Sequence, residues 1–337
     1  MNINNFVIMF SISLVSISDA RAWEANPTDN RYQQGRSLDL IPYHTLHEDI
    51  TWSALECAAT ENLALDAQGL PQCPPLSFPA RAPEPGNFDS ALIRGVWWND
   101  DPNQLLNSVH YGTWVIYMKD GKRRSRTQGR INSTYKMQYR SHYGDLQFLH
   151  AMASSDGQEA SETQRKIMDW MEFAYAVSVG DIAAHARMGE IDYSMAKEYF
   201  SNQSGWSVNY LFRPKYLLRG NSLPDNALGS MLHVIQDSYA GGHAGRNPGP
   251  TEACPFGTIG QFRAYQSQDE KKHANADSKQ ALLETDPRLV PINARLIQLH
   301  RAKADWDAQV RPFLEQVFCI SASSQPSGPG EFGNGKT

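Results

Sequence analysis

The sequence predicts a mainly α-helical fold: one domain over residues 23–320, with a short β-hairpin inserted at about residues 112–141. Three observations lead to this prediction. Apolar residues recur at three- and four-residue steps in most long segments, as they do on one face of an α-helix. One segment combines β-prone residues with an Asp-Gly turn signal. The chain of 337 residues is long enough for one large core.

Residues 1–22 have the features of a secretory signal peptide. Phe6–Ile17 is apolar but too short for an ordinary membrane-spanning helix. Ala20-Arg21-Ala22 matches the small-residue pattern of a signal-peptidase cleavage site. We therefore expect the mature chain to begin at Trp23 and to be secreted as a soluble protein.

Several segments are expected to form the helices of this domain. One begins after Ser155-Asp156, and its apolar residues recur at helical spacing from Ile167 to Tyr175. The other expected helices are 47–60, 180–200, 226–240, 262–283 and 293–317.

The expected hairpin lies between the first helices and the rest of the chain. The β-prone run Trp114–Met118 leads into Asp120-Gly121, and a second run follows at Tyr135–Tyr139. Its tip is surrounded by basic residues, which are Lys119, Lys122, Arg123, Arg124, Arg126 and Arg130. Either a solvated tip or contact with anionic lipid head groups accounts for them.

The cysteines and the C-terminus complete the expected organisation. Four cysteines allow three pairings, of which we favour Cys57–Cys73 and Cys254–Cys319. Zinc-thiolate binding is the weaker alternative, because no C-x-x-C is present and an exported chain meets an oxidising compartment. Residues 321–337 are rich in Gly, Pro and Ser, and we expect a disordered tail. The net charge of −5 argues against a nucleic-acid binder driven by bulk electrostatics.

The stretch from His233 to His243 carries the strongest chemical signal. His233 and Asp237 are four residues apart in an apolar segment, so on a helix they project from one face. Gly241-Gly242 then ends the helix and lets His243 fold back toward the same point. A divalent metal is the simplest single partner for two buried imidazoles and a carboxylate. An ordinary His-Asp hydrogen bond in a helical core is the alternative.

Further His and Asp residues have spacings or positions typical of metal ligands. They are His47, the adjacent acids Asp100 and Asp101, the histidines His142 and His150, and the pair His273 and Asp277, which repeats the four-residue spacing.

This ordered set resembles the zinc-dependent phospholipase C family, which shares its fold and trinuclear zinc site with the P1/S1 nucleases. The resemblance covers roughly residues 23–280 as ordered motifs. In that family the mature chain begins at a Trp whose amine and carbonyl bind zinc, and cleavage after Ala22 would expose Trp23. A His-x-x-Ile/Val pattern follows, which His47–Ile50 matches.

The later motifs of the family also occur in order. Its core signature is His-x-x-x-Asp followed by five residues and a His, which His233, Asp237 and His243 match. Its last pair, His-x-x-x-Glu or His-x-x-x-Asp, is matched by His273 and Asp277.

The middle of the family pattern fits less closely. The family places one Asp and one His there, a short distance apart. Asp100 and Asp101 compete for the first role, and His142 and His150 for the second. Either His lies about 40 residues or more beyond the acids, so the expected hairpin looks like an insertion.

The resemblance implies a set of ligands for three zinc ions. They are Trp23, His47 and Asp237 for one; His233, Asp237, one of Asp100 and Asp101, and one of His142 and His150 for a second; and His243, His273 and Asp277 for the third. Asp237 would bridge two ions, and one of Asp100 and Asp101 would also act as a general base.

The resemblance implies a secreted phospholipase C that hydrolyses phosphatidylcholine-type phospholipids to diacylglycerol and a phosphorylated head group. Zinc lowers the pKa of bound water to about 7 and clamps phosphoryl oxygens, as hydrolysis of a phosphodiester requires. The expected partner is a phospholipid membrane surface, with no stable nucleic-acid partner, and the expected state is monomeric. The alternatives are a P1/S1-type single-strand nuclease and a catalytically silent zinc protein that attaches to membranes or partners.

Overall fold

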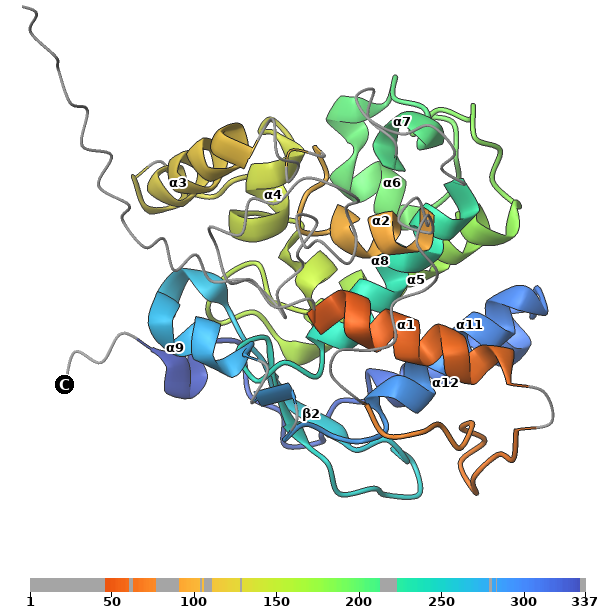
Figure 1. Ribbon diagram of the computed structural model, residues 1–337. Helices are drawn as coiled ribbons and strands as arrows, with labels where there is room; N and C mark the ends of the chain where they lie inside the picture. The colour runs from red at the N-terminus through yellow and green to blue at the C-terminus, as the bar shows by residue number, and fades with distance from the viewer. Residues whose placement is uncertain are drawn as a thin grey trace, which may run out of the picture.

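The computed structural model describes residues 46–60, 63–76, 91–103, 105, 111–127, 129–212, 223–278, 281–282 and 284–333. Within these ranges the protein is mainly helical, which confirms the predicted fold class at that level (Figure 1). The expected signal peptide and Trp23 lie outside the described residues. None of the described helices is both long and apolar enough to cross a lipid bilayer.

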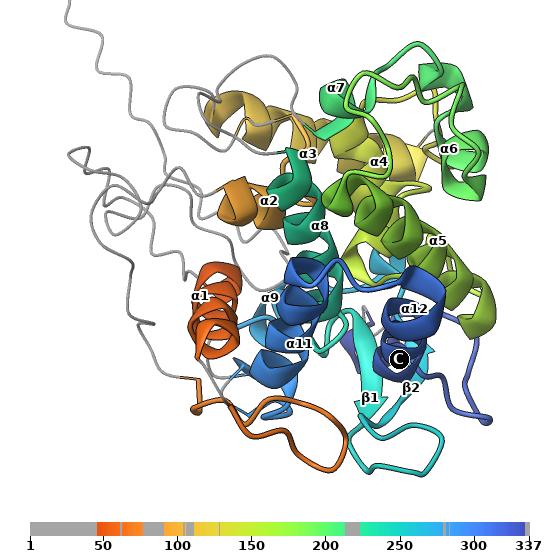
Figure 2. The same ribbon diagram turned by 90° about the vertical axis from the view of Figure 1, so that its right-hand side faces the viewer.

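Helix α8 (Leu223–Asp237) is the centre of the fold. Its side chains are buried from Asn226 to its last residue. Its neighbours are α1 (Leu46–Ala59), α2 (Ala91–Trp98), α5 (Ala160–Val179) and α11 (Leu289–Arg301). Figure 2 shows α8 with α1 and α2 on one side and α5 on the other. A residue on α8 therefore reaches segments from most of the chain.

Two glycines allow α2 and α8 to approach closely. A Cβ atom at Gly229 would collide with the backbone of α2, and one at Gly95 would collide with the backbone of Asn226. Only glycine permits this separation. The contact brings Val96 to His233, whose Nδ1 lies 2.7 Å from the Val96 carbonyl oxygen. It also places Asp100, just beyond the end of α2, near the C-terminal half of α8.

The structure contains the two disulfides that the sequence analysis favoured. Cys57, on α1, is bonded to Cys73. Cys254 is bonded to Cys319, which follows α12 (Arg311–Val317). Disulfides persist in oxidising compartments, so both bonds fit an extracellular type of environment.

The expected hairpin at residues 112–141 is wrong: the segment forms helix α3 (Tyr111–Thr127) and helix α4 (Met137–Tyr143). Asp120 is bonded to the arginines three and four residues later, a pairing that stabilises a helix. A Cβ at Gly121 would touch the rings of Tyr139 and Tyr143, so this glycine lets α3 lie against α4. The Asp-Gly pair therefore forms no turn. Asp120 makes ion pairs within α3, and Gly121 allows α3 to pack against α4.

The sheet of the described chain lies instead in its C-terminal half. Strand β1 (Ala244–Asn247) pairs antiparallel with β2 (Thr258–Phe262), with a register shift at Gly245/Arg246. The continuous helix expected at 262–283 is therefore wrong: β2 ends at Phe262, α9 covers Glu270–Ala276, and residues 281–282 are helical again. The helix expected at 180–200 is shorter than predicted: it is α6 (Ser194–Tyr199), and the short helix α7 (Val208–Phe212) follows it. That expected at 293–317 is interrupted after α11, where a π-helix (Trp306–Val310) leads into α12.

Residues 321–333, which were expected in a disordered tail, are packed against the domain. The Ala264 N–H donates to the Gly328 carbonyl oxygen at 3.0 Å, and the Asp269 N–H donates to that of Phe332 at 2.7 Å. The Ser327 hydroxyl donates to the Ser155 carbonyl oxygen at 2.6 Å. Glycine and proline shape an ordered segment here. Residues 334–337 lie outside the described residues.

Candidate metal centre

Nine buried His and Asp side chains form three adjacent groups, and in each group the three potential ligand atoms lie within 4.8 Å of one another. The groups are His47, His233 and Asp237; Asp100, His142 and His150; and His243, His273 and Asp277. The structure thus brings together residues that are up to 230 positions apart in the sequence, from His47 to Asp277.

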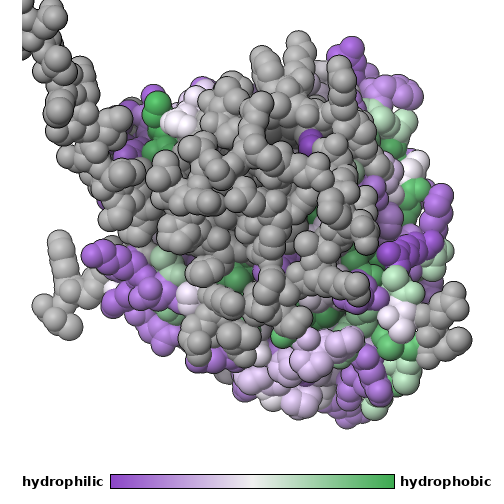
Figure 3. All heavy atoms as spheres, in the orientation of Figure 1, coloured by the Kyte–Doolittle hydropathy of each residue, from purple (hydrophilic) through white to green (hydrophobic). Residues whose placement is uncertain are grey.

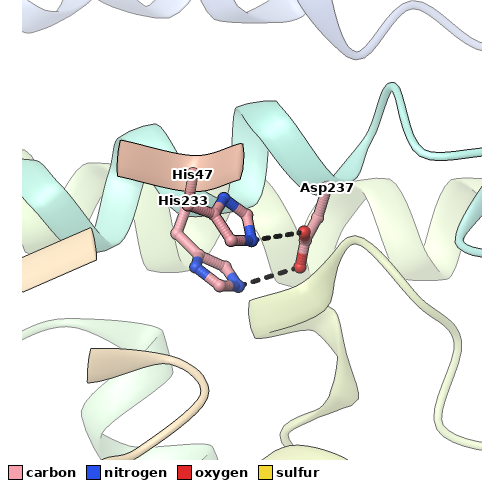
Figure 4. Close-up of side chains that lie close together, drawn as sticks. All are labelled: His47, His233 and Asp237. Atoms are coloured by element: carbon pink, nitrogen blue, oxygen red, sulfur yellow. Dashed lines mark ion pairs between the residues drawn. The ribbon is translucent and has the colours of Figure 1, made fainter. Parts of the chain in front are cut away.

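Asp237, the last residue of α8, lies between these groups. Its Oδ2 is 2.9 Å from His233 Nε2 and 2.9 Å from His150 Nδ1. Its Oδ1 is 3.4 Å from Nε2 of His47, on the first turn of α1. Figure 4 shows His47 and His233 both directed at this carboxylate, and their rings are stacked at 4.1 Å. One carboxylate therefore faces imidazoles from three separate segments.

The second group joins one residue that precedes α3 in the sequence, Asp100, with two that follow it, His142 and His150. Asp100 Oδ1 is 3.8 Å from Nε2 of His142, in the last turn of α4. It is 4.0 Å from Nδ1 of His150, which ends a short 3₁₀-helix (Gln147–His150). Both candidate histidines thus lie near Asp100, and Asp101 is in none of the three groups. This group is nearest the surface, since the His142 side chain is 9% exposed and that of His47 is 0% exposed.

The third group forms where the chain turns back after α8. Asp277, at the C-terminal end of α9, lies 3.0 Å from His273 Nε2 and 3.7 Å from His243 Nε2. A Cβ at Gly242 would lie 2.8 Å from His273 Nδ1 and 3.1 Å from Asp277 Oδ1. Glycine at this position therefore leaves the space in which the group assembles.

Five of the six histidines have Nδ1 near a carbonyl oxygen. The contacts are His47 to Gln236 Oε1 (2.5 Å), His142 to Gln138 O (3.1 Å), His233 to Val96 O (2.7 Å), His243 to His150 O (2.6 Å) and His273 to Gln268 Oε1 (2.5 Å). A carbonyl oxygen only accepts, so in the neutral form of each ring Nδ1 carries the proton and Nε2 is the nitrogen that can bind a metal. Metal-ligating histidines have this arrangement, which orients the ring and raises its basicity as a ligand.

Several atoms directed into the groups have no hydrogen-bond partner among the described residues. They are Nε2 of His47, His150 and His243, Oδ1 of Asp237, and both carboxylate oxygens of Asp277. Leaving buried polar atoms unsatisfied costs about 1–3 kcal/mol each. Cations would satisfy these atoms together, and imidazole nitrogen with carboxylate oxygen is a donor set that suits zinc. The residues therefore fit three metal ions, although the geometry leaves the identity of the metal open.

The protonation states of the metal-free groups are uneven. Burial alone would raise the pKa of Asp237, but nearby His233 and His243 outweigh it and hold that pKa well below the usual value. Burial lowers the pKa of His243, yet Asp237 and Asp277 outweigh it and raise that pKa to about 9. Burial raises the pKa of Asp277 to about 6, and burial together with His150 lowers that of His142 to about 3. At neutral pH His243 therefore carries a proton that a metal ion must displace.

Sequence reasoning did not identify the residues that hold the histidines in place. Gln268 Oε1 accepts a hydrogen bond from His273 Nδ1, and Gln268 Nε2 donates to the Gly242 carbonyl oxygen at 2.8 Å. Gln236 contacts His47, which is 189 positions away. The position of Gln236, directly before Asp237, was the only available signal. Trp23, the remaining predicted ligand, lies outside the described residues.

No protein-family model, curated protein or solved structure matches the chain. The site must therefore be interpreted from its own geometry. The described residues offer three metal-binding groups that converge on Asp237 within one buried cluster. Such an arrangement can bind a phosphoryl group between cations and activate water against it.

Proposed function

We propose that the protein is a secreted phosphodiesterase with three zinc ions, of the phospholipase C type, acting on phosphatidylcholine-like phospholipids. The observation that carries this proposal is the convergence of the three His/Asp groups on Asp237, with Nδ1 of five of the six histidines held by a carbonyl oxygen. The order of these residues in the chain is also the order of the motifs that resemble the phospholipase C family.

The residues of each group would hold one zinc ion. Asp237 directs one oxygen toward the His47 side and the other toward His233 and His150, so its carboxylate would serve two ions. When bound, zinc lowers the pKa of water to about 7 and polarises phosphoryl oxygens.

The protein's own groups position the ligands and handle a proton. Gln236, Gln268 and the Val96 carbonyl oxygen orient three of the imidazole rings. His243 would give up a proton on binding a metal, because Asp237 and Asp277 outweigh its burial and raise its pKa to about 9. Asp101, buried beside Asp100 but outside the three groups, would act as the general base.

A paired assay tests the substrate class. Phosphatidylcholine vesicles and a single-stranded DNA are each incubated with the full chain, with and without a chelator. We expect phospholipid hydrolysis that the chelator abolishes and that added zinc restores. DNA cleavage without phospholipid hydrolysis would assign the centre to a P1/S1-type nuclease. Metal binding without either activity would leave a catalytically silent zinc protein.

Two adjacent variants separate a ligand from a base. Asp100→Asn removes a group member and should lower both metal content and activity. Asp101→Asn changes a neighbouring buried acid outside the groups, so it should keep the metal content and lower only the rate. Loss of metal in Asp101→Asn would show that the two roles are exchanged.

A further inference from the structure

Helix α3 presents one exposed face along its whole length. The exposed positions follow each other at steps of three and four residues, as one side of a helix requires. They are Gly112, Ile116, Lys119, Arg123 and Arg126, which we call the α3 stripe; Thr127, the last residue of the helix, is also exposed. Its opposite face packs on α4 through Trp114 and Met118, in a small hydrophobic cluster separate from the main core. The stripe is thus the outer side of a small two-helix layer formed by α3 and α4, which lie side by side in Figure 1.

The stripe belongs to the most basic segment of an acidic chain. Seven Lys and Arg residues and one acid lie between Lys119 and Lys136, whereas the whole chain has a net charge of −5. Where the surface over α3 is visible in Figure 3, hydrophilic atoms lie beside hydrophobic ones. The net charge of this segment is therefore positive, whereas the net charge of the whole chain is negative.

The one acid of the segment neutralises only part of its charge. Asp120 is paired with Arg123 at 2.6 Å and with Arg124 at 2.7 Å, and it also accepts a hydrogen bond from the Tyr139 hydroxyl. Among the described residues, Lys119 and Arg126 have no carboxylate within ion-pair distance. The stripe thus keeps a positive charge that an anionic surface can bind.

Two features favour a lipid surface over a nucleic acid. Ile116 is 63% exposed and lies on the same face as the basic side chains, so this face offers a lipid surface an apolar side chain beside charges for its phosphates. Single-stranded nucleic acids are bound by stacking bases on exposed aromatic rings. Three rings of this layer are buried instead, since Trp114 is 1% exposed, Tyr139 7% and Tyr143 3%, and the half-buried ring of Tyr117 is covered by the Lys136 ammonium group.

The layer that carries the stripe also contacts the metal centre. The Trp114 Nε1–H donates to the Asp100 carbonyl oxygen at 3.5 Å, and Gln138 Nε2 donates to the same oxygen at 2.8 Å. His142, the most exposed member of the three groups, is on α4. The layer that carries the stripe therefore packs, through its inner side, against the part of the centre that is nearest to solvent.

We propose that the α3 stripe docks the protein onto the anionic surface of phospholipid membranes, with Ile116 entering the interface and the basic residues contacting lipid phosphates. The proposal rests on the proposed function in one respect only: the membrane to which the protein docks is also its substrate. Docking itself is measured without hydrolysis. Each basic residue near such a surface strengthens binding about fivefold, and salt screens the effect.

The test compares two triple variants of the full chain in a vesicle co-sedimentation assay. Lys119→Gln, Arg123→Gln and Arg126→Gln remove the charge of the stripe while keeping side chains that favour a helix. The matched control removes three exposed basic charges elsewhere, by Arg187→Gln, Lys197→Gln and Arg301→Gln. Vesicles contain phosphatidylcholine alone or mixed with phosphatidylglycerol, and the chelated protein is used so that lipid is not consumed.

On the mixed vesicles at low salt, we expect the stripe variant to bind up to about a hundredfold more weakly than the wild type, and less so as salt rises. The control should bind as the wild type does, and Ile116→Ser should weaken binding by about tenfold. Thermal melting shows that the variants are folded. Hydrolysis of a short-chain soluble phospholipid by the metal-loaded stripe variant should be unchanged, which separates docking from catalysis.

Three results would overturn the proposal. One is equal vesicle binding by the wild type and the stripe variant at low salt. Another is an equal loss in the control variant, which would show an effect of total charge alone. The third is loss of single-stranded oligonucleotide binding with unchanged vesicle binding, which would make the stripe a nucleic-acid surface. Docking without any phospholipid hydrolysis would uphold the stripe as a membrane surface and reject the proposed function.

Discussion

Replacing Asp237 by asparagine tests whether one carboxylate serves two of the three metal groups. The side chain is fully buried, and its oxygens lie 2.9 Å from His233, 2.9 Å from His150 and 3.4 Å from His47. Asparagine keeps the volume and removes the charge. The expected loss is therefore electrostatic, and it extends to two metal ions.

The size of the effect on the metal-free protein follows from the burial of Asp237. Removing one partner of a buried ion pair costs about 3–5 kcal/mol. In a chain of this size that corresponds to a fall in Tm of roughly 4–7 °C. The pKa of Asp237 in the folded protein lies below its usual value. Its stabilisation is thus complete above about pH 4, is lost as the pH falls further, and applies in full at neutral pH.

Asp277→Asn is the matched comparison, because Asp277 is equally buried but contacts only the third group. Burial raises its pKa to about 6, so the metal-free folded protein disfavours this carboxylate at neutral pH. Asparagine should therefore leave the Tm of the chelated protein unchanged or raise it. In the loaded protein Asp277→Asn should lose one zinc, whereas Asp237→Asn should lose two.

The assay measures Tm by scanning fluorimetry in excess chelator and metal content by mass spectrometry after loading with zinc. Equal losses of metal in the two variants, or a mild and equal change in Tm, would refute the bridging position of Asp237.

Three further predictions follow from the geometry. Zinc binding to the metal-free protein at pH 7 should release protons, because His243 has a pKa of about 9, and the zinc affinity should rise with pH up to that value. Calorimetry in buffers of different ionisation enthalpy measures the number of protons released. Zinc binding without proton release would contradict this prediction. Gly242→Ala should lower the metal content by one ion, because the added Cβ lies 2.8 Å from His273 Nδ1; full metal content would show that the third group adjusts without loss. A mature chain with one extra residue before Trp23 should lose one zinc and most activity, as the resemblance implies, and unchanged metal content and activity would remove Trp23 from the ligands.

The residues of the candidate centre could be predicted where a local spacing reflects helix geometry. His233 and Asp237, and likewise His273 and Asp277, are one helical turn apart, and the structure places each pair together. The residues that orient these histidines could not be predicted in the same way. Gln236 reaches His47 across 189 positions, and the carbonyl oxygen of Val96 reaches His233 across 137. Such contacts depend on helix packing that no local pattern encodes.

The failed predictions share a physical cause, because residues that often form turns were used here for packing. Asp120-Gly121 lies within α3, where Asp120 binds arginines and Gly121 fits against α4. The β-prone residues before it fill the cluster between the two helices, as Trp114 and Met118 show. The glycine and proline residues of 321–333 likewise belong to a segment bonded to the domain at Ala264 and Asp269. Tertiary contacts decided the outcome in each case.

Metal content of the full mature protein, measured by native mass spectrometry after loading with zinc, tests the central claim most directly. The three His/Asp groups predict three zinc ions per chain, all removed by a chelator and all restored by zinc. One ion per chain, or none, would contradict the proposed centre.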